Sequence, residues 1–61
     1  MIYDNIKKIC EERKNSVSTV EKKAGLSNGT ICKWNSSSPT VNKLQSVAKV
    51  LDVKIDELLS S

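Results

Sequence analysis

The chain has 61 residues, of which 38% are hydrophobic and 28% charged, and it carries a net charge of +3. These values fit one ordinary globular domain, which we expect to span residues 1–61, and they exclude a disordered or fibrous chain. The absence of histidine removes the commonest general base and metal ligand, and the spacing of Cys10 and Cys32 matches no zinc motif. We therefore expect no enzyme, no cofactor and no metal site.

Nothing in the sequence points to a membrane or to an oxidising compartment. No apolar run approaches the roughly 20 residues that a membrane span needs. The N-terminal MIYDNIKK lacks the apolar region of a signal peptide, and two cysteines are too few for the disulfide framework of a small secreted domain. We expect a cytoplasmic protein.

The charges are unevenly distributed along the chain. Residues 16–51 contain five lysines against one acid, Glu21, whereas the stretch from Asp52 onward is acidic. A basic middle of this kind is typical of a phosphate-binding surface, although a solvated lysine face has the same composition.

The hydrophobic pattern predicts helices throughout and no strand. A first helix begins at Ile2 and runs to Lys14 or Asn15, because its apolar residues share one stripe. A second helix of about eight residues follows, capped by Ser16 and ended by Gly25 in a left-handed conformation.

A third short helix is predicted over residues 27–35, with Ser27 as its cap and Ile31 and Trp34 facing inward. Residues 36–39 form a loop by composition. Thr40 then caps the clearest amphipathic helix of the chain, over residues 41–51, and a fifth, short helix covers residues 55–59.

Two short helices joined by a glycine-containing turn, with a longer helix on each side, form the layout of a DNA-binding helix-turn-helix, here at about residues 16–36. With Ile31 and Trp34 turned inward, the geometry of a helix turns small or polar residues outward. These outward residues are Asn28, Gly29, Cys32 and Lys33.

Such a face fits a DNA groove, because low bulk lets the backbone approach the bases. Asn28 can donate to and accept from adenine, Lys33 can reach guanine or a phosphate, and Thr30 can bond a base or meet a thymine methyl. Backbone amides beside Ser16 and Ser27 could bind phosphate oxygens. The candidate base-reading residues are Asn28, Gly29, Thr30, Cys32 and Lys33.

Three segments carry a family resemblance: SVSTVEKKAGLSNGTICKW, SSPTVNKLQSVAKVLDV and IDELL. In their order and spacing the chain resembles the Cro and phage-repressor helix-turn-helix family, also called XRE-like, from Ile6 to Leu59. The resemblance implies a compact all-α, five-helix bundle of the lambda-repressor-like type, with helices two and three as the helix-turn-helix. It also implies binding to operator DNA as a symmetric pair.

The family's base-reading positions fall on the outward residues named above, with Ser27 and Thr30 near the DNA backbone. Where the family often has a phosphate-touching glutamine, this chain has Val17, so that contact is lost or is taken over by Ser18. The residues expected at phosphates are Ser16, Val17, Ser18, Ser27, Asn35, Ser36, Ser37 and Lys43.

Other departures concern packing and helix ends. Glu21 stands where a small residue is common, so packing between the two short helices is expected to differ. Asp52 replaces a family glycine and Lys54 a family serine cap, which is expected to weaken those caps.

The resemblance implies a transcriptional repressor of a phage or bacterial mobile element, bound to a double-stranded operator with an inverted repeat. We expect a homodimer at least on DNA, either through a contact of Val53, Ile55, Leu58 and Leu59 or through pairing on DNA alone. The alternative is a helix-turn-helix bundle that docks on another regulator or on a toxin, favoured by Val17 and by a single charge, Lys33, on the third helix.

Overall fold

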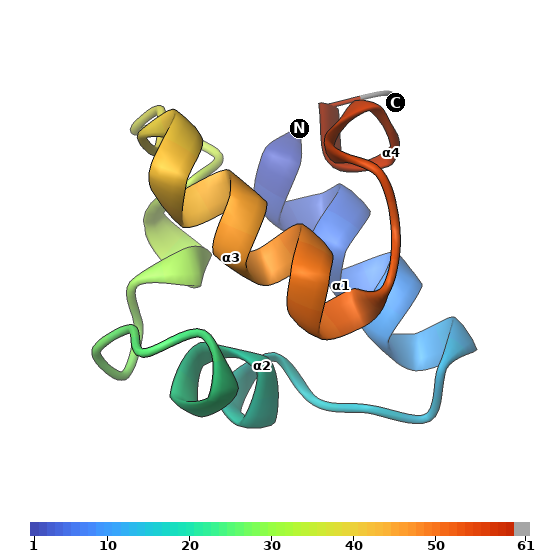
Figure 1. Cartoon of the computed structure of the whole chain (residues 1–61). Helices are drawn as coiled ribbons and strands as arrows, with labels where there is room; N and C mark the ends of the chain where they lie inside the picture. Colours follow the sequence, from blue (N-terminus) through green and yellow to red (C-terminus); the bar gives the residue numbers. More distant parts are fainter. Residues whose placement is uncertain (60–61) are drawn as a thin grey trace.

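The computed structural model describes residues 1–59. Helices joined by turns and loops make up this part of the chain, and it contains no strand. Figure 1 shows their arrangement. The elements are α1 (Ile2–Glu12), α2 (Val17–Lys23), the 3-10 helix η1 (Ile31–Lys33), α3 (Val41–Leu51) and α4 (Ile55–Leu59). The all-α prediction is confirmed. The prediction of five α-helices is not, because η1 and the turns beside it replace the third.

One apolar core joins all the elements. α4 packs against α1 and α3, α2 packs against the same two helices, and η1 packs against α1. The residues predicted to face inward on residues 27–35, Ile31 and Trp34, are both buried. The buried apolar side chains are Ile6, Cys10, Val20, Ile31, Trp34, Leu44, Val47, Ala48, Leu51 and Leu58.

The first three α-helices end in the same way. A residue in the left-handed region follows each helix, namely Lys14 (φ 54°), Gly25 (φ 75°) and Asp52 (φ 56°). The amide of the residue that follows then donates to the carbonyl five positions earlier, as in the bond from Leu26 N–H to Glu21 O at 2.8 Å. This is the bonding of a Schellman motif, and it confirms Gly25 as the residue that ends the second helix.

Two of the three predicted N-caps, Ser16 and Thr40, are present. Ser27 does not cap a helix, because the next helical turn, η1, begins only after Thr30, which itself makes no side-chain cap bond. The Ser16 hydroxyl accepts from the Thr19 amide at 3.1 Å, and the Thr40 hydroxyl accepts from the Lys43 amide at 3.3 Å. At the start of α4, where the family has a serine cap, the Glu57 carboxylate accepts from the Lys54 amide at 3.1 Å. Glu57 thus satisfies a backbone group that would otherwise lack a partner inside the helix.

Residues 27–35 do not form an α-helix, for local reasons. Gly29 has a φ of 85°, which lies outside the right-handed helical region, so a helix cannot continue from Asn28 through Gly29. A helix that contains a glycine and has fewer than ten residues also gains little from cooperative propagation. The segment is therefore a turn, a single 3-10 turn and a second turn, and it runs along one side of the molecule between α2 and α3 (Figure 1).

Candidate nucleic-acid interface

The helix-turn-helix region consists of α2 and the segment that follows it, residues 27–35, which we call the reading segment. Its inner side is fixed by Ile31, which is fully buried, and by Trp34, which is 5% exposed. The Trp34 indole is therefore part of the core and is unavailable for stacking on a base. Although the segment is not an α-helix, its two apolar residues anchor it as the sequence predicted.

The outer side of the reading segment presents small and polar groups. Asn28, Cys32 and Lys33 are exposed, and Gly29 and Thr30 are partly exposed. The Cys32 thiol donates to the Gly29 carbonyl at 2.9 Å, which holds the thiol close to the segment's own backbone. The structure thus brings the five candidate base-reading residues together on one short stretch of surface.

Glycine is favoured at position 29 by the backbone conformation and not by a lack of space for a side chain. A Cβ built at this residue would meet only the Cys32 sulfur, at 4.0 Å, which is an ordinary contact. The positive φ is instead the feature that disfavours other residues.

Glu21 connects α2 directly to the reading segment. Its side chain is 3% exposed. One carboxylate oxygen accepts from the Gly29 amide at 3.1 Å and the other from the Ile31 amide at 2.8 Å. These two amides are therefore already bonded, so they are not among the backbone amides that could bind a phosphate near Ser27.

The candidate phosphate residues at α2 lie at its start and just after it. Ser16, Ser18 and Ser27 are exposed, whereas Val17 is partly buried and packs against the core. Val17 therefore contributes an apolar contact at a position where the family often has a polar side chain.

A second group of candidate phosphate residues lies in the loop after the reading segment and in the first turn of α3. Ser36, Ser37 and Lys43 are exposed, and both Ser36 and Ser37 bond back to the Lys33 carbonyl. Asn35 differs, because its side chain is bonded to α1. Its Oδ1 accepts from the Tyr3 amide and its Nδ2 donates to Asp4, both at 3.1 Å.

Two functional contributions were missed by reasoning from the sequence. Asn35 caps the first turn of α1, a role with no local sequence signal because the two residues it bonds lie about 30 positions away. Glu21 braces the reading segment, and the available signals were its place as the one acid of residues 16–51 and its departure from the family's small residue.

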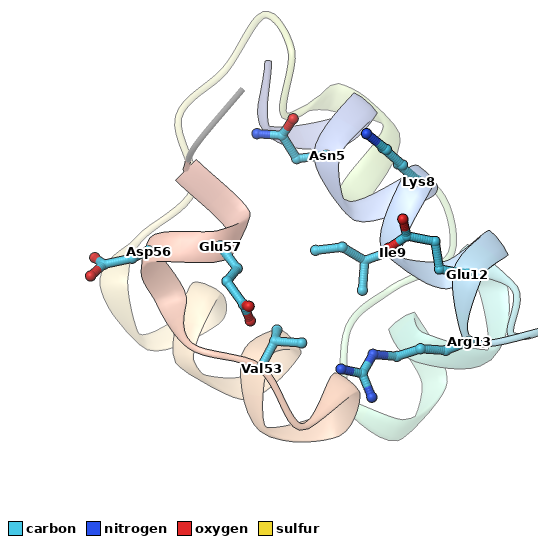
Figure 2. A pocket seen from close by; sticks show the side chains of 8 residues that line it. All are labelled: Asn5, Lys8, Ile9, Glu12, Arg13, Val53, Asp56 and Glu57. Carbon is cyan, nitrogen blue, oxygen red and sulfur yellow. The ribbon is translucent and has the colours of Figure 1, made fainter.

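A hollow of about 360 Å³ lies between α1 and α4, outside the helix-turn-helix (Figure 2). Ile9 and Val53 line it together with charged side chains of both signs, including Arg13 and Glu57. None of the candidate DNA-contacting residues lines this hollow.

The four residues expected to form a contact between protomers are not equivalent. Leu58 is fully buried and belongs to the core, so it is not available to a partner. Val53 and Ile55 are partly buried, and Leu59 is 51% exposed.

The two cysteines also differ. Cys10 is buried in the core, and burial, together with the carboxylate of Glu11, raises the pKa of its thiol. Cys32 is exposed on the reading segment.

Comparison with known families agrees with this geometry. The family model described as Cro/C1-type HTH DNA-binding domain matches residues 5–61, which is nearly the whole chain. The chain belongs to this family. No curated protein and no solved structure gives a significant match.

This membership makes the chain a DNA-binding regulator at the level of its family. Within residues 1–59, no helix has both the length and the apolar character that crossing a bilayer requires. The same residues contain no cluster of three or more side chains of the types that hold metal ions.

Proposed function

We propose that this Cro/C1-type domain binds duplex DNA sequence-specifically and represses transcription, as a regulator of a phage or of a bacterial mobile element. The observation that supports this most strongly is the reading segment. Its small and polar outer residues are exposed, while Ile31 and Trp34 hold its inner side in the core. A groove-entering element needs this combination of a rigid base and low outward bulk.

In this proposal Asn28 and Lys33 are the leading base readers, supported by Thr30. Gly29 and Cys32 allow the backbone to come close to the base edges. Phosphates are held by serines at the start of α2 and just after it, by the loop before α3 and by the first turn of α3. The residues proposed at phosphates are Ser16, Ser18, Ser27, Ser36, Ser37 and Lys43. We leave out Asn35, whose side chain is bonded to α1, and Val17, which is partly buried.

One domain of this size contacts a single half-site, so specific regulation requires two copies on an inverted repeat. We propose a homodimer on the operator, with Leu59 as the most exposed of the four residues expected at the contact and with the partly buried Val53 and Ile55 contributing to it. We place the protein in the cytoplasm of a bacterium.

Two alanine variants separate base reading from phosphate binding. Asn28→Ala should cost about 1 to 3 kcal/mol on the preferred duplex and relax one base position. Lys43→Ala should weaken binding to all duplexes alike and reduce the salt slope by about one. Lys8→Ala is the matched control, because it removes the same charge from the α1–α4 hollow (Figure 2). Equal losses on preferred and random duplexes for Asn28→Ala would contradict its reading role.

The second candidate is docking on a protein partner. The low charge of the reading segment and the apolar contact of Val17 favour it. Salt dependence separates the two functions, because DNA binding weakens steeply with salt and apolar docking does not.

A further inference from the structure

The first turn of the reading segment lacks the hydrogen bonds of a regular helix. Gly29 has a positive φ, and the amides of Gly29 and Ile31 both bond to the side chain of Glu21. The backbone at residues 29 and 31 is thus held by a residue of α2, eight and ten positions earlier in the chain. Asn28 precedes these two anchored amides, Thr30 lies between them, and Cys32 follows them.

The charge of Glu21 is also unusual for its place. It is the single acid among residues 16–51, which otherwise contain five lysines. A carboxylate exposed on a DNA-binding face would repel phosphates. Glu21 instead has 3% of its surface exposed, and both of its oxygens accept from backbone amides, as charge-assisted hydrogen bonds.

We propose that Glu21 is a positioning residue that sets sequence specificity without touching DNA, by fixing the backbone from which the base-reading side chains project. This inference rests on the proposed function. A bond to a charged group contributes more than a neutral bond, and a base reader must be placed to within a fraction of an ångström. Loss of the two bonds therefore affects the discrimination between sequences more than the attraction to phosphates.

The test uses Glu21→Gln, which keeps the shape of the side chain but places an amide group opposite one of the two N–H donors. The matched control is Glu12→Gln, which makes the same change in net charge at an exposed position of α1. Affinities are measured for the duplex that the unmodified chain selects from a random library and for a random duplex.

For Glu21→Gln we expect the ratio of the two affinities to fall by at least about tenfold, while the affinity for random duplex and its salt slope stay at the control's values. Glu12→Gln should keep the ratio of the unmodified chain. Glu21→Asp keeps the charge but is one methylene shorter, and it should lower the ratio of the two affinities as well. An unchanged ratio in folded Glu21→Gln would overturn the proposal.

Amide hydrogen exchange gives a readout that does not depend on DNA or on a variant that folds. In the free, unmodified chain the Gly29 and Ile31 amides should be protected, and in folded Glu21→Gln they should exchange faster while the core amides of α3 do not. Fast exchange of both amides in the unmodified chain would overturn the proposal.

Failure of the proposed function would be recognised separately. If the unmodified chain selects no duplex at all, sequence-specific binding is wrong, and the specificity role of Glu21 is refuted with it. If the unmodified chain selects a duplex and Glu21→Gln keeps the ratio, only the role of Glu21 is refuted.

Discussion

The helix ends offer a direct test of how the fold is held together, because two of the three left-handed positions are not glycine. An L-residue in this conformation costs about 1 to 2 kcal/mol relative to glycine. Replacing the residue by glycine removes this cost, but the greater freedom of glycine in the unfolded chain offsets about 0.4 to 1 kcal/mol of the stabilisation. Lys14→Gly should therefore raise the free energy of unfolding by about 0.5 to 1 kcal/mol. For a domain of this size, 1 kcal/mol corresponds to about 4 to 8 °C in Tm.

The other two left-handed positions, Gly25 and Asp52, should respond differently. Asp52→Gly should stabilise less than Lys14→Gly, because the short aspartate side chain stabilises the left-handed conformation locally. Gly25→Ala should destabilise by about 0.5 to 1 kcal/mol. No atom lies within 4 Å of a Cβ built at Gly25, so the backbone alone accounts for the loss.

Thermal and urea unfolding followed by circular dichroism measure these changes. Lys14→Gln is the control, since it removes the same charge and keeps the Cβ, and its stability should stay close to that of the unmodified chain. A Lys14→Gly chain no more stable than Lys14→Gln, or a Gly25→Ala chain as stable as the unmodified one, would contradict these expected changes.

The cysteines provide two further predictions. A thiol reagent should modify Cys32 rapidly and Cys10 only as fast as the chain unfolds, and equal rates in the native protein would contradict the burial of Cys10. Because the pKa of Cys10 is raised in the folded state, its contribution to stability is complete below its ordinary value of 9.0 and is lost as the pH rises through the raised value. The free energy of unfolding, measured from pH 8 to 10, should fall for this reason, and in Cys10→Ala the fall should be smaller. The same dependence of the free energy of unfolding on pH in the variant would contradict the raised pKa of Cys10.

The sequence predicted most of the fold because the informative signals were local. The apolar stripes placed α1 and α3, and Ser16, Gly25 and Thr40 marked helix boundaries that the structure confirms. Asp52 was expected to weaken the end of its helix as a replacement for glycine. It nevertheless adopts the left-handed conformation that the family glycine would have.

The reading segment was predicted less completely, because part of its backbone is held by a side chain outside the segment, that of Glu21 in α2. Periodicity identified its buried side through Ile31 and Trp34. Of the four residues predicted to face outward, three are exposed and Gly29 is partly exposed. Periodicity could not show that a carboxylate of α2 accepts hydrogen bonds from the amides of residues 29 and 31. Nor could it show that the turn at Asn28 and Gly29 prevents an α-helix. Asn35 was assigned to phosphate for the same reason, since its bonds to α1 join residues about 30 positions apart.

Selection of bound duplexes from a random library tests whether this protein binds duplex DNA sequence-specifically. Binding of the enriched duplex is then repeated at about 50 mM and 200 mM salt. We expect an inverted repeat with half-sites about one helical turn apart, bound less tightly at the higher salt but still in preference to random DNA. An absence of enrichment, with only weak binding that disappears at the higher salt, would contradict it.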